Sequence, residues 1–227
     1  FDYLLHRYLW RPFKWIGRKS GIMGPRWGLA SLLALFVVGA TGFSLKEQLH
    51  FEFHQYLTLL FSVLALAMVL KAFAEREDAK HAWLTALLSQ FFSALSLLWN
   101  KDIAWHQTGI YLSGTVVAAI IGYICLHKIE SKEGEISLHE YHGHSYEHPG
   151  LGLVFLLAAL GFSGLPITPT FLGIDLMFTH ISANQIVLVV LTGLNFLFLE
   201  LTILRIYSRV FLGQHKKMYH PVAFKSS

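Results

Sequence analysis

The apolar stretch at residues 151–182 constrains this chain more than any other feature, because Gly164, Pro166, Thr168 and Pro169 interrupt it near its middle. Proline lacks a backbone N–H and its ring clashes with the preceding turn, so a helix entering this stretch must break there. In hydrocarbon, backbone groups freed by a break are tolerated only where protein buries them or water reaches them. The stretch therefore predicts a discontinuous helix whose break forms a hydrated gate, as in ion pathways. The alternative is a proline kink that serves helix packing alone.

The composition indicates a membrane protein. The hydrophobic content is 54% and the mean hydropathy is +0.50, which is more apolar than a soluble domain. Most of the apolar residues fall in segments close to the length that a helix needs to cross a bilayer. The sequence therefore predicts an all-α polytopic membrane helix bundle with about six spans, one of them discontinuous. The predicted spans are residues 27–43, 53–73, 82–99, 109–127, 151–182 and 186–212.

The distribution of positive charge predicts the orientation of the chain. Almost all of the 18 Lys and Arg residues flank the predicted spans on one and the same side. By the positive-inside rule that side is cytoplasmic, so we expect a bacterial inner-membrane protein with both termini in the cytoplasm. The chain then divides into an interfacial segment, four transmembrane helices, a cytoplasmic His-rich loop, the broken helix with the last helix, and a cytoplasmic tail. Their respective bounds are 1–26, 27–127, 128–149, 150–213 and 214–227.

The N-terminal segment, residues 1–26, interleaves basic with aromatic side chains. Such an amphipathic mixture is typical of a segment that lies in the lipid headgroup layer. Nucleic-acid binding proteins also use this mixture, but the apolar spans that follow argue against that function here.

Glu200 is the strongest candidate for chemistry within a span. It follows the apolar residues 186–199 and precedes Leu201, Ile203 and Leu204, which places it deep along the predicted last helix. An ionised carboxylate at that depth costs at least a few kcal/mol, so the group should be neutral, paired or hydrated. We therefore predict that Glu200 is a protonatable relay. The alternative is a structural carboxyl group that donates one hydrogen bond to a neighbouring helix.

Four other ionisable residues are predicted to contribute to the same pathway. Asp175 lies in the second half of the broken helix, where it either feeds protons to Glu200 or stabilises the positive N-terminal end of that half-helix. His180, of a residue type that exchanges protons near neutral pH, is a candidate entry or exit group. Arg205 does not share a helix face with Glu200, so it is either an interfacial anchor or the charge partner of another helix. Lys71 ends the second span as an anchor or as a relay.

The loop after the fourth predicted span is rich in histidine and glutamate. Imidazole and carboxylate groups together suit zinc or nickel, but the loop contains no cysteine. Our first expectation is a proton-collecting or docking loop at the cytoplasmic mouth, without a metal or a cofactor. A metal site and an ordinary connector are the two alternatives. The loop residues concerned are His139, His142, His144 and His148.

Several residues of the second half follow a recognisable order: Pro149, an apolar helix, Gly164-Leu165-Pro166, Pro169, Phe171, Asp175, and a helix ending in Arg205, Tyr207, Val210, Phe211 and Gly213. Over about residues 122–213 this pattern resembles the late part of the antiporter-like subunits of respiratory complex I. That superfamily includes Mrp-type cation/proton antiporters, membrane-bound hydrogenases and the membrane subunits of inorganic-carbon accumulation complexes. Asp2-Tyr3 and Arg11-Pro12 resemble the junction that follows the antiporter core in the longest of those subunits.

The resemblance implies a proton half-channel made from a broken helix and buried charged residues, coupled sideways to neighbouring units. Glu200 and Asp175 are the positions of this chain that could serve in it. The chain departs from the family at Thr170-Phe171 and at Ile174, where Gly-Phe and a lysine are frequent. Because no lysine falls in the middle of a span, we expect a partner, or a further part of the polypeptide, to complete the path.

The sequence thus predicts a membrane subunit of a larger complex, or the C-terminal part of one, that translocates protons or a coupled cation. It contains no phosphate-binding glycine loop, nucleophile elbow or dinucleotide fingerprint, so we expect no active site of its own. The expected partners are other membrane or peripheral subunits and the lipid bilayer, not nucleic acid. The alternatives are a subunit that couples proton flow to bicarbonate or CO2 uptake with a zinc-containing partner, a non-conducting scaffold that docks a soluble partner, and a metal transporter.

Overall fold

The computed structural model describes residues 26–45, 54–100, 105–134, 136–182 and 184–213. Apart from Arg26, the predicted interfacial segment 1–26 and the tail 214–227 lie outside these residues. Within the described part of the chain there are seven helices and no strand, so the predicted all-α class is confirmed there. The helices are α3 (Arg26–Ser44), α5 (His54–Ala74), α6 (Ala79–Leu98), α7 (Trp105–Glu133), α8 (Pro149–Ser163), α9 (Pro169–Thr179) and α10 (Ile186–Val210).

Four of these helices, α5, α6, α7 and α10, are long and apolar enough to cross a membrane. Residues Ala30–Ser44 of α3 and the whole of α8 are shorter apolar helical segments. Membrane insertion therefore agrees with the described structure, while the number of about six spans stays a prediction.

The fourth predicted span is longer in the structure than in the sequence analysis. Hydropathy ends that span at His127, but α7 continues through a polar segment to Glu133. A helix needs backbone hydrogen bonds rather than apolar side chains to continue, so it can extend past the point where hydropathy falls. The His-rich loop consequently begins after Glu133 and not at residue 128.

The helix starts have local causes. Asp78 precedes α6, and its carboxylate accepts a hydrogen bond from the Lys80 backbone N–H at 2.7 Å, as N-cap residues do. Pro149 is the first residue of α8, where a missing N–H leaves no intrahelical bond unmade.

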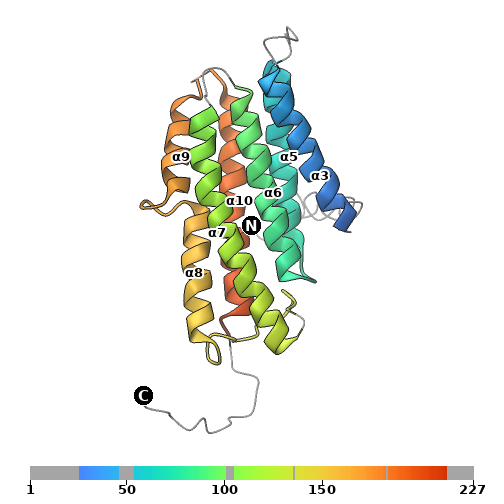
Figure 1. Cartoon of the computed structure of the whole chain (residues 1–227), viewed down its shortest axis with the longest axis vertical. Coiled ribbons are helices and arrows are strands. Elements are labelled where there is room, and N and C mark those ends of the chain that lie inside the picture. Colours follow the sequence, from blue (N-terminus) through green and yellow to red (C-terminus); the bar gives the residue numbers. More distant parts are fainter. Residues whose placement is uncertain (1–25, 46–53, 101–104, 135, 183, 214–227) are drawn as a thin grey trace, which may run out of the picture.

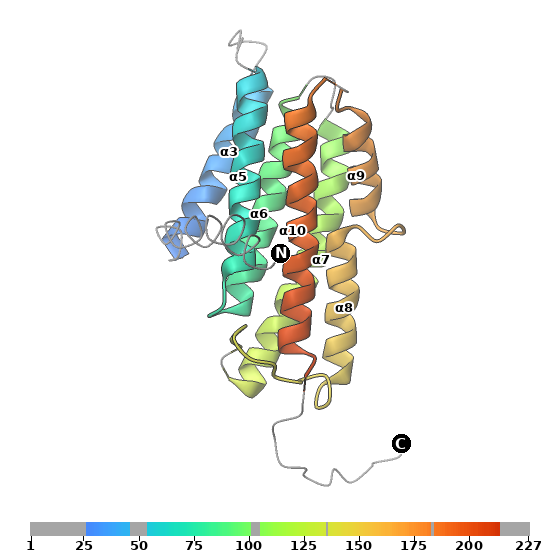
Figure 2. The ribbon, with the colours of Figure 1, turned by 180° about the vertical axis from the view of Figure 1, so that it is seen from behind.

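The helices form one bundle around α6, α7 and α10 (Figure 1). Helix α6 packs against α5, α7 and α10, and α3 packs mainly against α6 at the edge of the bundle. Helix α10 also packs against α5 and α8 (Figure 2). Helices α8 and α9 lie one after the other along α7, which contacts both (Figure 1).

Trp83 of α6 is fully buried in contact with Phe155 and Phe162 of α8. Its indole Nε1 donates a hydrogen bond to the Ala119 carbonyl of α7 at 2.8 Å. A Cβ atom at Gly122 would lie 2.3 Å from the Trp83 ring, so only glycine admits the indole here. Gly114 and Gly122 of α7 allow neighbouring helices to approach closely, as small residues do in membrane helices.

The loop between α7 and α8 is folded onto the ends of other helices. The backbone N–H groups of His142, His144 and Ser145 donate to the carbonyls of Arg209, Val210 and Phe211 at 2.9, 3.2 and 3.0 Å. These carbonyls lie at the C-terminal end of α10, where no intrahelical donor is available. The loop is therefore a capping element of the bundle and more than an ordinary connector.

We predict that Gly122→Ala lowers the stability of the protein by about 1–3 kcal/mol, because its Cβ would force the Trp83 ring out of its packed position. The measurement is the thermal unfolding midpoint of the purified protein in detergent. Gly109→Ala, also on α7 but with no atom within 4 Å of the added Cβ, is the control and should leave the midpoint unchanged or slightly raised. Equal midpoints for the two variants would contradict this account of the packing.

Candidate functional site

The break between α8 and α9 is closed by the chain's own hydrogen bonds. Helix α8 ends at Gly164, whose φ of 90° lies in the left-handed region, and the N–H groups of Gly164 and Leu165 both point to the Leu160 carbonyl. A Cβ at Gly164 would lie 2.8 Å from Ile174 Cδ1, which is a second reason for glycine. Helix α9 then begins at Pro169, after Thr168 has donated its hydroxyl to the Leu165 carbonyl at 2.7 Å.

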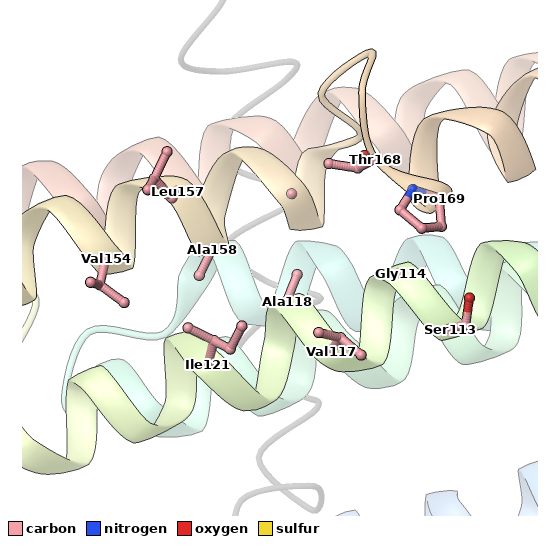
Figure 3. Close-up of a pocket in the computed structure, with 11 residues that line it drawn as sticks. Ser113, Gly114, Val117, Ala118, Ile121, Val154, Leu157, Ala158, Thr168 and Pro169 are labelled. Atoms are coloured by element: carbon pink, nitrogen blue, oxygen red, sulfur yellow. The ribbon is translucent and has the colours of Figure 1, made fainter.

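A groove of about 450 Å³ lies beside this break, between α7 on one side and α8 and α9 on the other (Figure 3). Of the predicted gate residues, Thr168 and Pro169 line it, whereas Gly164 and Pro166 do not. Its remaining lining is apolar apart from Ser113, whose hydroxyl donates to the Ile110 carbonyl. The described residues therefore gather no row of polar groups in the groove.

The two predicted acids face outward. Glu200 is exposed on α10, while its neighbours Leu199, Thr202 and Ile203 are buried. Asp175 is exposed on α9. Neither carboxylate is hydrogen bonded or ion paired to another residue that the structure describes. The predicted relay at Glu200 therefore stays a prediction, at a side chain that faces away from the bundle: position along a helix sets depth, but position around the helix sets the direction of the side chain.

The two predicted cations lie together at the C-terminal end of α5. Arg205 donates from Nη1 to the Phe73 carbonyl, and its guanidinium stands 5.7 Å from the centroid of the Phe73 ring. Lys71 is buried, and Glu75 interacts electrostatically with both Lys71 and Arg205. Cations are favourable at the C-terminal end of a helix, where backbone carbonyls are unpaired. Arg205 therefore joins α10 to α5.

His180 follows the last residue of α9. Its Nδ1 lies 2.6 Å from the Leu176 carbonyl, and because a carbonyl only accepts, Nδ1 carries the proton. Glu200, Asp175, His180 and the Lys71–Arg205 pair thus do not form one continuous site within the described residues.

Several buried polar side chains that sequence reasoning missed lie inside the bundle. The Tyr111 hydroxyl donates to Gln90 Oε1 at 2.6 Å, and Gln90 Nε2 donates to the Ser89 hydroxyl at 2.7 Å. Asn195 of α10 is 1% exposed, and neither atom of its amide has a hydrogen-bond partner among the described residues. The hydroxyl of Thr170, at the start of α9, is also buried and has no hydrogen-bond partner among the described residues.

Three of these buried polar residues lie at similar depth in the bundle. From the helical rise per residue, Gln90, Tyr111 and Asn195 are roughly 9 to 14 Å from the nearer ends of α6, α7 and α10. A buried amide without a partner costs about 1–3 kcal/mol, so such groups are normally satisfied by ordered water. Gln90 and Asn195 each lie inside an apolar segment of the sequence, and their amides were the signal that could have indicated these buried polar residues.

The four loop histidines have different surroundings. His139 is exposed and contacts Glu77 at 3.0 Å, and His142 Nε2 donates to the Ser137 carbonyl at 2.8 Å. His144 lies with Glu133 and Glu147 in a group whose ligand atoms are within 4.8 Å of one another. These three residues could hold a metal ion. His148 Nε2 donates to Glu133 Oε1 at 3.0 Å.

We predict that Tyr111→Phe lowers stability by about 1–3 kcal/mol, because it leaves the buried Gln90 carbonyl oxygen without its donor. The double variant Tyr111→Phe/Gln90→Leu should recover most of that loss, since both partners are then apolar. Thermal unfolding of the single and double variants measures the coupling. Additive losses in the double variant would show that the two groups do not interact.

Comparisons of the chain with protein-family models, with curated proteins and with solved structures find no match. The resemblance to antiporter-like subunits therefore stays a prediction from the sequence.

Proposed function

We propose that this chain is a membrane subunit of a proton- or cation-translocating complex, and that its path is completed at an interface with another subunit or a further part of the polypeptide. The observation that carries the proposal is the exposed carboxyl group of Glu200, near the middle of an apolar helix. In this proposal α8 and α9 together form one discontinuous span.

The position of Glu200 is incompatible with lipid alone. By the helical rise per residue, it lies about 21 Å along α10 from Ile186 and about 15 Å before Val210. Insertion measurements give about 2.5–3.5 kcal/mol for a charged aspartate at the centre of a membrane helix, and glutamate should resemble it. A partner helix or water that faces the carboxyl group would remove this cost.

The surroundings of Glu200 resemble a helix interface. Leu197, Leu201 and Leu204 are exposed on α10 beside it. Apolar contact with one polar group at the centre is how membrane helices associate, because the polar group finds its hydrogen-bond partner on the neighbouring helix. This surface supports lateral contact with a second helical unit, where Glu200 would exchange a proton.

The buried polar residues inside the bundle support the same proposal. Tyr111, Gln90 and Asn195 are neutral, so they can order water without holding charge. The start of α9 lies close to Gly114 of α7: a Cβ atom added at Gly114 would lie 2.5 Å from the backbone nitrogen of Thr170. We propose that water held by these groups supplies the uncharged part of the path, and that Glu200 supplies its protonatable group.

A second candidate function is a non-conducting scaffold that docks a soluble partner. The observation in its favour is the folded loop of residues 136–148, which exposes the aromatic rings of Tyr141 and Tyr146. Exposed tyrosines are enriched at protein interfaces. Tyr146→Ala should then release a peripheral partner from the purified complex without changing ion flux.

We predict that Glu200→Gln lowers proton flux at least about tenfold in vesicles reconstituted with the complete complex, because glutamine cannot release a proton. Assembly, measured by size-exclusion chromatography, should remain intact since the amide keeps the shape of the side chain. Glu140→Gln, on the exposed loop, is the control and should conduct like the wild type. Unchanged flux in Glu200→Gln would remove this residue from the mechanism.

A further inference from the structure

We infer that Glu133, His144 and Glu147 form a binding site for a divalent transition-metal ion of the zinc type. Each residue offers one ligand atom, and the three atoms lie within 4.8 Å of one another. This site is independent of the proposed proton path. The sequence indicated a metal site in the loop only as an alternative, and that site did not include Glu133.

The ligands are held by three different structural features. Glu133 is the last residue of α7, and Glu147 precedes Pro149, the first residue of α8. His144 is fixed by its backbone, because its N–H donates to the Val210 carbonyl at 3.2 Å and its carbonyl accepts from the His148 N–H at 2.9 Å. Ligands on helix ends and on a hydrogen-bonded turn lose little freedom when an ion binds.

The charge of the cluster favours a cation. Two carboxylates repel each other at this separation, and the low exposure of the Glu133 side chain, 9%, strengthens the repulsion. His148 donates from Nε2 to Glu133 Oε1. A divalent ion between the carboxylates would neutralise both.

The ligand chemistry selects the class of ion. One imidazole nitrogen and two carboxylate oxygens suit zinc, whose ligands lie at about 2.0–2.2 Å. Tetrahedral ligands at that distance are about 3.4 Å apart, so the group has to contract by no more than about 1.5 Å. The hydrogen bond from His148 would then orient Glu133, as outer partners of metal ligands do.

The ring of His142 stacks on the ring of His144 and restricts its orientation. The two ring centroids lie 5.3 Å apart, with 13° between the ring planes. Bound metal would join the end of α7 to the start of α8 and to the loop that caps α10. The three protein ligands leave a fourth coordination position open for water or another ligand.

The test is zinc binding by the full chain, purified without a histidine tag, stripped with chelator and titrated with ZnCl2 alone. The wild type should bind about one ion per chain. His144→Ala and Glu147→Gln should each weaken binding at least about tenfold. The control is His139→Ala, which alters a histidine of the same loop outside the cluster and should bind like the wild type.

Circular dichroism and size-exclusion chromatography establish that each variant is folded. If His144→Ala does not fold, Glu147→Gln carries the test, because it keeps the size of the side chain and removes only the charge. Cobalt in place of zinc should give visible absorption in the wild type and none in either variant. Failure of the stripped wild type to take up zinc, or equal uptake by the wild type and Glu147→Gln, would overturn the inference.

Discussion

Backbone carbonyl groups at the ends of helices are the constraint on which this structure depends. Where protein or hydrocarbon covers them they have no water to bond, so a donor from the chain itself satisfies them. Loop residues 142–145 supply donors to the end of α10, Arg205 supplies one to the end of α5, and Gly164 closes α8. The loop and the break are thereby part of the bundle, and their side chains acquire fixed positions.

Hydropathy and turn chemistry predicted the helices well, because both act locally along the chain. The two prolines and Gly164 stand where α8 gives way to α9, and the remaining predicted spans match helices to within a few residues, except α7, which extends further at its C-terminal end. The segment 1–26 and the tail 214–227 lie outside the described residues, apart from Arg26, so this comparison does not extend to them.

The candidate site was harder to predict because it depends on directions around helices. The depth of Glu200 follows from counting residues, whereas its outward direction follows from which side of α10 packs against α5 and α6. The same packing turns Asn195 inward, and its amide was not selected because one neutral polar residue in an apolar helix gives a weak signal. Likewise, Glu133 joins His144 only because α7 continues past the end of its apolar segment.

The central claim is that Glu200 faces a partner or water and not lipid. The most direct measurement is the collision accessibility of a spin label at Glu200→Cys, in a Cys125→Ser background, within the assembled complex in membranes. We expect low accessibility to oxygen, which concentrates in hydrocarbon, because a partner or water excludes lipid from this position. High accessibility to oxygen with low accessibility to a water-soluble nickel chelate would place the residue in lipid and contradict the account.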